Sequence, residues 1–526
     1  MRFAPLLLLA GLPTAFAAFG ITAGSGYIDV NTGNKLVYRV STSSGDITSI
    51  KYNSVEYQYS KKYTQIASGL GTATVSYKTS GSYIIITIAT STLTQYYVAV
   101  SGQDALYVGT YITVEPDVGE LRFIARLNAD LLTGPTQSNA RGKCMSGTAI
   151  EGSDVFTVSG QTRSKFYSSV RFIEDKVHGV TGSGVGVYMV IPGNGYETSS
   201  GGPFHRDIDN QNSPSDDGAQ EVYYYMNSNH EQTESYRTGF FGPYALVFTS
   251  GSAPSSSLDL SFFDSLGLTG YVASSGRGTV SGTVSGVSSS FAAVVGLSNS
   301  AAQYWGTASG GSFSISGVKP GTYTATLYKK ELAVATGSVT VSAGKTSSLS
   351  LTSSESLPTL IWQIGAPDGT PSGFLNADKI ETMHPTDSRM SSWGPVTYTI
   401  GSSSASAFPM AQFIAVNNPT TIKWTATSSQ IGARTLRIRT TSSYNGGRPT
   451  IQVNSWTSST PAAPTEIDSR GVTRGTWRGL NQLYEYSIPS GTLVAGSNTI
   501  TITIVSGSSG DAFLSPNVVY DSVELY

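Results

Sequence analysis

Two arginines and two tyrosines lie four and two residues apart, respectively, in two segments of the N-terminal half of the chain. Arg122 and Arg126 alternate with apolar residues, and Tyr223 and Tyr225 flank Tyr224. Every second residue of a β-strand shares a face, which places the two arginine Cα atoms about 13 Å apart on an open face. Guanidinium groups bind carboxylates and tyrosine rings stack on sugars, so the pattern is compatible with a site for an acidic carbohydrate. Surface ion pairs and cross-strand packing remain the plainer alternatives.

A lysine and two histidines lie near these segments and have the chemistry of proton transfer. Lys165 follows Arg163 by two residues, and a neighbouring cation lowers the pKa of a lysine, one route to a base near neutrality. His230 lies four residues after Met226, a position that suits the rim of a cleft. His205 lies in a polar loop. A solvated lysine and structural histidines are the competing interpretations.

Four carboxylates nearby leave a hydrolase open, because glycoside hydrolysis uses a pair of them. They are Asp207, Asp209, Glu231 and Glu234, and nothing in the sequence selects one pair. The two aspartates fall short of the oxygen spacing of a Ca²⁺ loop. We find no nucleophile elbow, zinc-protease motif or phosphate loop.

The composition favours strands as the elements that position these residues. Only 13% of the 526 residues are charged, and the chain has 58 glycines and 30 tyrosines. Such a composition is typical of strands joined by tight turns, and the length calls for several domains. Composition and strand pattern divide the chain into a first block at 18–265, a small sandwich at 266–352 and a third block at 358–526, the size of a jelly roll. In the third block Trp393, Tyr444 and Trp477 are candidate sugar platforms, although each fits a core equally well.

The N-terminus predicts secretion. Residues 1–17 combine Arg2, a short apolar run and small residues at a cleavage site, which is typical of a signal peptide. No later run is long enough to span a bilayer, so no membrane partner is expected. The net charge of −2 and the lack of a basic run argue against nucleic acid. Cys144 is the only cysteine, so no internal disulfide forms.

Six segments together resemble the fungal rhamnogalacturonan lyases of polysaccharide lyase family 4. The segments are residues 119–126 (GELRFIAR), 162–169 (TRSKFYSS), 200–207 (SGGPFHRD), 223–237, 383–395 (MHPTDSRMSSWGP) and 468–475 (DSRGVTRG). The resemblance spans nearly the whole mature chain. It implies an all-β protein of three domains: a β-supersandwich, a fibronectin-III-like sandwich and a jelly roll similar to carbohydrate-binding modules.

The resemblance also implies an activity and its residues. The family cleaves the α-1,4 rhamnose–galacturonate bond of rhamnogalacturonan I by β-elimination, with a lysine and a histidine that fall on Lys165 and His230. The family's cleft residues fall on Arg122, Arg126, Tyr223 and Tyr225, and His205 is expected to contact substrate as well. No cofactor or metal is expected in catalysis, and a structural Ca²⁺ is left open. The expected partner is the polysaccharide, bound by a monomer.

Three other functions stay open at this point. A hydrolase of the same polymer would use two of the carboxylates, a non-catalytic protein would bind without making chain ends, and a related lyase would act on another uronate polymer. The division of base and acid between Lys165 and His230 is also open.

Overall fold

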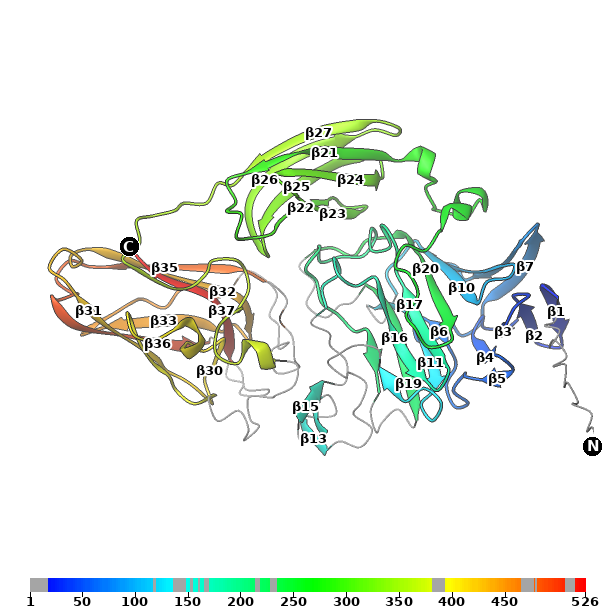
Figure 1. The fold of residues 1–526 in the computed structure, drawn as a ribbon, viewed down its shortest axis with the longest axis horizontal. Coiled ribbons are helices and arrows are strands. Elements are labelled where there is room, and N and C mark those ends of the chain that lie inside the picture. The colour runs from blue at the N-terminus through cyan, green and yellow to red at the C-terminus, as the bar shows by residue number, and fades with distance from the viewer. Residues whose placement is uncertain are drawn as a thin grey trace, which may run out of the picture.

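The computed structural model shows a chain built almost entirely of β-strands in three domains (Figure 1). The structure describes residues 18–116, 120–135, 148–151, 155–158, 161–164, 170–212, 218–227, 234–380, 393–464, 477, 480–506 and 516–526. The helices in these ranges are short 3-10 turns, and none of them is long and apolar enough to cross a membrane. The all-β fold class is therefore confirmed. The signal segment 1–17 and Cys144 lie outside the described residues.

Domain I contains strands β1 to β20. Its first sheet has the order β1-β2-β3-β4-β5 and consists of β1 (Gly20–Gly24), β2 (Tyr27–Asn31), β3 (Leu36–Ser41), β4 (Ile47–Tyr52) and β5 (Val55–Glu56). An eight-stranded sheet has the order β12-β16-β17-β20-β10-β9-β8-β7. Its strands are β7 (Thr74–Ser80), β8 (Tyr83–Ala89), β9 (Leu93–Val100), β10 (Ala105–Ile112), β12 (Gly134–Pro135), β16 (Val177–Gly182), β17 (Val185–Val190) and β20 (Gly239–Thr249).

A four-stranded sheet packs against this large sheet and carries the residues singled out by sequence. Its order is β18-β19-β11-β6, with β6 (Gln65–Ile66), β11 (Leu121–Asn128), β18 (Asn210–Gln211) and β19 (Ala219–Asn227). Aromatic side chains join the two sheets: the Phe123 ring lies 6.3 Å from Tyr97 and 5.8 Å from Tyr244, and Tyr224 lies 4.4 Å from Tyr244. A small fourth sheet holds β13 (Thr148–Glu151), β14 (Val155–Val158) and β15 (Gln161–Ser164).

Domain II is a two-sheet sandwich with one apolar core. Its sheets have the orders β24-β21-β27 and β23-β22-β25-β26. The strands are β21 (Gly278–Ser285), β22 (Ala293–Ser298), β23 (Gln303–Thr307), β24 (Ser312–Val318), β25 (Gly321–Lys329), β26 (Leu332–Val341) and β27 (Thr346–Thr352). Alternating apolar residues on each strand supply the core, as the period of two requires.

Domain III is a second, larger sandwich of the jelly-roll kind. One sheet has the order β28-β37-β32-β35, with β30 also paired to β37, and the other has the order β29-β31-β36-β33-β34. The strands are β28 (Trp362–Gly365), β29 (Thr397–Thr399), β30 (Ala411–Phe413), β31 (Thr420–Ala426), β32 (Arg434–Tyr444), β33 (Arg448–Val453), β34 (Trp456–Thr457), β35 (Gln482–Ile488), β36 (Gly496–Val505) and β37 (Asn517–Leu525). Trp393 lies in the core of this domain, 5.4 Å from the Phe413 ring, so it is not a surface platform.

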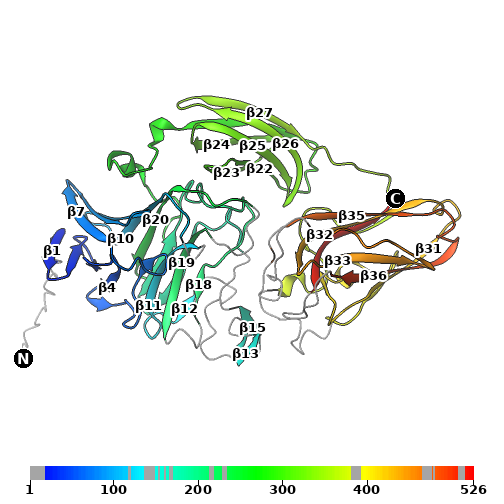
Figure 2. The ribbon, with the colours of Figure 1, turned by 180° about the vertical axis from the view of Figure 1, so that it is seen from behind.

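Domain II bridges the other two domains. Figures 1 and 2 show domains I and III side by side, with the domain II sandwich lying across both. The small sheet of β13 and β15 lies on the side of domain I that faces domain III. The arrangement puts the face of domain I that neighbours domain III at the centre of the molecule.

Candidate functional site

The pairing of β11 with β19 places the predicted residues on one face of the four-stranded sheet. Arg122 lies opposite Tyr225, Ile124 opposite Tyr223, and Arg126 opposite Glu221. Because side chains alternate along both strands, these six point the same way. The shared face predicted from the alternation is confirmed, and we call it the arginine–tyrosine face.

The other face of the same strands is apolar and buried. The residues on it are Leu121, Phe123, Ala125, Leu127, Val222, Tyr224 and Met226, all within the main core of domain I. This burial is what fixes the register, because a slip of one residue would turn the arginines into the core. The predicted inward face of the β11 segment is confirmed.

Carboxylates and hydroxyls hold the arginines in place. Arg122 donates from Nη1 to the Tyr225 hydroxyl at 2.7 Å and from Nη2 to Ser68 Oγ at 2.6 Å, and it forms an ion pair with Glu120. Each contact ties the guanidinium to a different segment. Two of its donors are therefore committed to fixed partners, which orients the group before any ligand arrives.

Glu221 organises the other end of the arginine–tyrosine face. Its Oε1 accepts a hydrogen bond from Arg126 Nε at 2.7 Å, and its Oε2 accepts one from the Tyr223 hydroxyl at 2.6 Å. Arg126 also donates to the Tyr63 carbonyl at 2.8 Å. Burial, reinforced by the Glu221 charge, raises the pKa of Tyr223 well above its ordinary value, so this phenol stays a hydrogen-bond donor. Sequence reasoning missed Glu221, although it precedes Tyr223 by two residues on the same face.

The tyrosines are more covered than the sequence indicates. Tyr223 and Tyr225 are 5% and 4% exposed, and their rings pack on each other at 5.8 Å. Ile208, from the loop before β18, joins them and Ile124 in a small apolar cluster. The packing of one ring on the other is therefore confirmed, and whether Tyr223 and Tyr225 contact substrate stays a prediction. The side chains of Arg122 and Arg126 are 22% and 12% exposed, respectively.

His205 lies in a tight loop beside this face. The His205 residue is 5% exposed, its Nε2 lies 3.4 Å from an Asp207 carboxylate oxygen, and its ring is 5.1 Å from Phe172. A Cβ on Gly201 would lie 2.4 Å from the imidazole, and Gly201 has φ of +104°, so only glycine suits this turn. The ring is thus packed inside the loop wall, and whether it contacts substrate stays a prediction.

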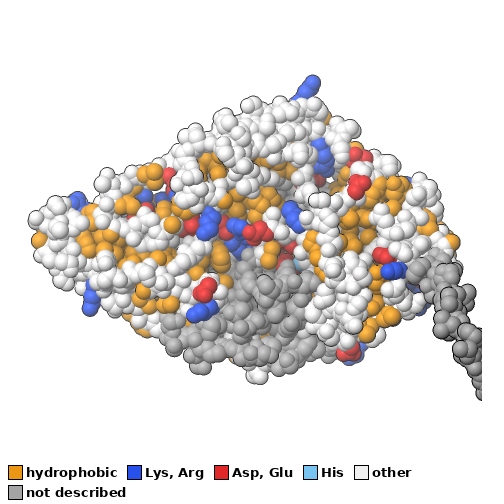
Figure 3. Space-filling view, in the orientation of Figure 1, with side chains coloured by type: hydrophobic (Ala, Val, Ile, Leu, Met, Phe, Trp, Pro, Cys, Tyr) orange, Lys and Arg blue, Asp and Glu red, His pale blue; other side chains and the backbone are white. Residues whose placement is uncertain are grey.

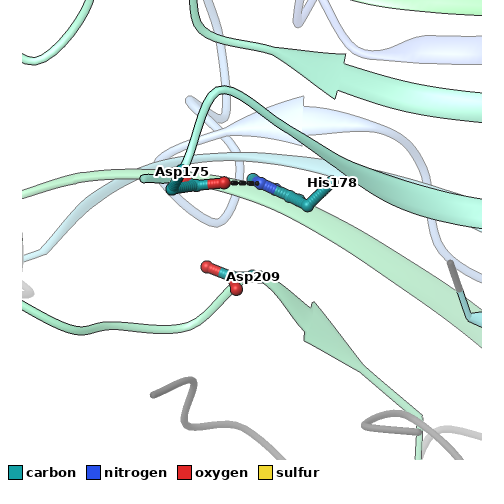
Figure 4. Close-up of side chains that lie close together, drawn as sticks. All are labelled: Asp175, His178 and Asp209. Carbon is teal, nitrogen blue, oxygen red and sulfur yellow. Dashed lines mark hydrogen bonds and ion pairs between the residues drawn. The ribbon is translucent and has the colours of Figure 1, made fainter. Parts of the chain in front are cut away.

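A buried ionic cluster of Asp175, His178 and Asp209 lies against the backbone of β19 (Figure 4). One ligand atom from each of Asp175, His178 and Asp209 lies within 4.8 Å of the others. His178 Nδ1 is 2.8 Å from Asp175 and its Nε2 is 2.5 Å from the Tyr223 carbonyl, so both nitrogens face acceptors. Both must then donate, which requires an imidazolium. The donor set fits a buried ion pair rather than a metal site.

The electrostatics agree with that protonation state. Burial lowers the pKa of His178, but the charge of Asp175 and its hydrogen bond outweigh burial and raise the pKa to about 9. The Tyr196 hydroxyl also donates to Asp175. The charged imidazolium therefore donates a hydrogen bond to the backbone carbonyl of Tyr223 in β19. Sequence reasoning missed this cluster; an aspartate three residues before a histidine was the only local signal.

The predicted catalytic pair lies outside the described residues. β15 ends at Ser164, directly before Lys165, and β19 ends at Asn227, three residues before His230. His230 therefore comes after a strand of domain I, as the sequence pattern indicates, and Lys165 is the residue directly after another. Glu231 also lies outside the described residues, whereas Glu234 is tied to Arg237 and to the Gly201 amide.

Comparison with known proteins gives matches along nearly the entire chain. The family description "Rhamnogalacturonan lyase B, N-terminal" matches residues 19–270. "Polysaccharide lyase family 4, domain II" matches residues 276–349, and "Polysaccharide lyase family 4, domain III" matches residues 360–525. The three matches follow one another in the order of the three cores.

Full-length relatives are also similar. Rhamnogalacturonate lyase A of Aspergillus aculeatus is 56% identical over 515 residues, which cover 97% of each chain. The protein of the same name from Emericella nidulans is 56% identical over the same length. A probable rhamnogalacturonate lyase A of Neosartorya fischeri is 52% identical over 528 residues, 99% of each chain.

Proposed function

The chain belongs to polysaccharide lyase family 4, and from this membership we infer that the protein is a rhamnogalacturonan lyase. The observation that carries the inference is the 56% identity to rhamnogalacturonate lyase A over 97% of both chains. The arginine–tyrosine face supports it, because two oriented guanidinium groups suit a polymer that carries a carboxylate on alternate sugars. A hydrolase and a non-catalytic binding protein are not favoured.

We propose that cleavage proceeds by β-elimination at galacturonate. The proton removed is on C5, beside the carboxylate, and its loss places enolate charge on the carboxylate oxygens. The C4–O4 bond to the leaving chain breaks as the C4–C5 double bond forms. A cation fixed beside the carboxylate lowers the barrier, since it binds the developing charge more strongly than the ground state. Arg122 or Arg126 supplies this cation in the proposal.

Lys165 and His230 supply the proton transfers in this proposal. Lys165 in its neutral form removes the C5 proton, and His230 protonates the leaving O4. The support is their place in the family motifs and directly after two strands of domain I. No cofactor or metal takes part. Secretion through residues 1–17, action as a monomer and domains at 18–265, 266–352 and 358–526 complete the proposal.

Ultraviolet absorbance tests the function directly. Elimination leaves a 4,5-unsaturated uronate, so digestion of rhamnogalacturonan I by the full chain should raise ultraviolet absorbance in step with new reducing ends. Homogalacturonan serves as the parallel substrate. New ends without absorbance would show hydrolysis, and binding without new ends would show a non-catalytic protein; either result overturns the proposal.

A single substitution tests the proposed base. Lys165→Ala should abolish turnover and leave oligosaccharide binding within about threefold, because the lysine acts on the proton rather than on the bound sugar. Lys51→Ala is the matched control, since Lys51 is an exposed lysine on β4 and belongs to none of the predicted site residues. Near-normal turnover in the Lys165 variant would remove it from the mechanism.

A further inference from the structure

The three domains meet at one tight turn of domain II. Lys330 and Glu331 connect β25 to β26, and Lys330 adopts a left-handed φ of 55°. Glu331 is 4% exposed although it lies at the tip of a hairpin. Figure 3 shows acidic and basic side chains gathered near the centre of the molecule, where the domains adjoin. A buried carboxylate at a hairpin tip calls for partners on the domains around it.

Domain I binds the Glu331 side chain. Arg206 donates from Nη2 to Oε1 at 2.6 Å and from Nη1 to Oε2 at 3.0 Å, a bidentate pair, and Arg171 Nη1 lies 3.2 Å from Oε1. Both Glu331 and Arg206 have side chains only 2% exposed. Two parallel hydrogen bonds fix the relative orientation of the groups as well as their distance.

Domain III binds the backbone of the same turn. The Glu331 and Leu332 amides donate to the Asp368 carbonyl at 2.9 and 3.1 Å, and the Asn481 side chain donates to the Glu331 carbonyl at 3.2 Å. A Cβ on Gly369 would lie 2.6 Å from the Glu331 carbonyl carbon, so the two backbones approach as closely as glycine allows. The turn is thus clamped from both sides.

Arg206 also reaches domain III directly. Its guanidinium carbon lies 4.3 Å from the centre of the Trp477 ring, a cation–π contact. One buried guanidinium therefore contacts its own loop in domain I, Glu331 of domain II and Trp477 of domain III. We call Arg206, Glu331 and Trp477 the three-domain joint. Trp477 serves this joint rather than an open sugar platform.

The loop that carries Arg206 ends at the arginine–tyrosine face. Two residues after Arg206, Ile208 packs with Tyr223 and Tyr225, and the Asp209 carbonyl accepts a hydrogen bond from the Tyr223 amide at 2.8 Å. A displacement at the joint would therefore move Ile208, which packs against Tyr223 and Tyr225. The loop connects the position of domain III to the geometry of the arginine–tyrosine face.

We propose that Arg206 and Glu331 are positioning residues of the lyase: they hold domain III and loop 201–209 in one arrangement about the arginine–tyrosine face, so that a long acidic polysaccharide is bound by both domains. The proposal rests on the proposed function. Contacts between domains usually permit motion unless the interface is large. A buried ion pair adds little net stability over apolar packing, and its value here is directional.

The experiment compares two buried interdomain carboxylates. Glu331→Gln breaks the three-domain joint. Glu197→Gln is the matched control: its carboxylate is also 2% exposed and binds Arg277 at 2.7 Å and Lys319 at 3.0 Å, but it joins only domains I and II. Arg206→Lys, which keeps the charge and loses the bidentate geometry, serves as a milder variant should Glu331→Gln fold poorly.

Two readouts separate positioning from stability. Initial rates are measured on long rhamnogalacturonan and on a short purified oligosaccharide, below the unfolding temperature of every variant, and small-angle X-ray scattering reports the domain arrangement. Glu331→Gln should lower kcat/KM on the polymer about tenfold, chiefly through KM, and on the oligosaccharide by less than about threefold. Its radius of gyration should rise. Arg206→Lys should change both readouts in the same direction by less, and Glu197→Gln should keep the wild-type polymer-to-oligosaccharide ratio.

Other results overturn the joint. An equal loss on both substrates, or the same ratio change in Glu197→Gln, would show a general structural defect. A wild-type chain that forms no ultraviolet-absorbing product would refute the proposed function. Small-angle X-ray scattering would then be the remaining test of the three-domain joint. An unchanged radius of gyration in Glu331→Gln would refute the joint.

Discussion

The charged state of His178 makes a testable contribution to the stability of domain I. The folded protein raises its pKa from 6.5 to about 9, because Asp175 and the Tyr223 carbonyl outweigh burial. A base whose pKa is raised on folding stabilises the protein below its unfolded pKa, and this stabilisation is lost as the pH rises through the folded value. At about 1.4 kcal/mol per pKa unit, the protonated imidazole contributes roughly 3 kcal/mol at pH 6 and almost none at about pH 9.5.

Removing the imidazole isolates that contribution. His178→Gln keeps one donor but no charge, so buried Asp175 keeps its Tyr196 hydrogen bond and loses the imidazolium charge, and the variant should be less stable at pH 6 by about 3–5 kcal/mol. The gap between wild type and variant should shrink by roughly 3 kcal/mol at about pH 9.5. Lys176, whose pKa is lowered by burial, and Tyr196, whose pKa is raised by burial and Asp175, titrate in both proteins and largely cancel in the difference.

Domain I can be followed separately because it has no tryptophan. The chain has six tryptophans, all after residue 300, so tryptophan fluorescence reports domains II and III. Nine of the 30 tyrosines also lie after residue 300, so urea unfolding of domain I is taken at each pH as the part of the tyrosine circular-dichroism change that does not follow tryptophan fluorescence. Asp175→Asn is the control, since without the carboxylate charge the pH-dependent part should diminish. A wild-type-to-variant gap that stays constant between pH 6 and 9.5 would refute the assignment of His178 as an imidazolium.

Two further substitutions test the arginine–tyrosine face and its loop. Glu221→Gln removes the charge that orients Arg126 and Tyr223. Because hydrogen bonds to charged groups contribute about 1.5–3 kcal/mol, kcat/KM on rhamnogalacturonan should fall about 10- to 100-fold. A lowered melting temperature with unchanged kcat/KM would count against an orienting role. Gly201→Ala places a Cβ against His205 in a left-handed turn and should cost about 1–3 kcal/mol of unfolding free energy, measured by calorimetry; a melting temperature equal to wild type would show that the loop relaxes freely.

Strand periodicity is enough to predict which residues share one face of the four-stranded sheet. Arg122 and Arg126 had to share a face with each other because the period of a strand is two, and Phe123 had to point inward because the alternate positions are apolar. The pairing of β11 with β19 that brings Tyr225 opposite Arg122 joins residues 103 positions apart. Alternation within each strand carries no information on that pairing, and only the motif resemblance linked the two segments.

The packing of Ile208 on that face could not be predicted either, because it also depends on how distant segments pair. Ile208 shields Tyr223 and Tyr225 because the loop before β18 folds back along β19, and nothing in the polar composition of the loop indicates that path. Likewise the partner of His178 is a backbone carbonyl 45 residues away. A backbone acceptor has no sequence signature, so the histidine resembles any other until the strands are paired.

The buried ionic groups explain how a chain with few charges and one cysteine fixes its domains. Only 13% of the residues are charged, yet Arg206, Glu331, Glu197 and His178 are all nearly inaccessible. Apolar side chains would hold the same surfaces together at similar stability, but they would tolerate sliding. A bidentate pair does not, since a displacement of about 1 Å breaks both hydrogen bonds. If the polymer is bound by two domains, as we propose, the site needs that directional constraint, and the bidentate pair of Arg206 and Glu331 supplies it.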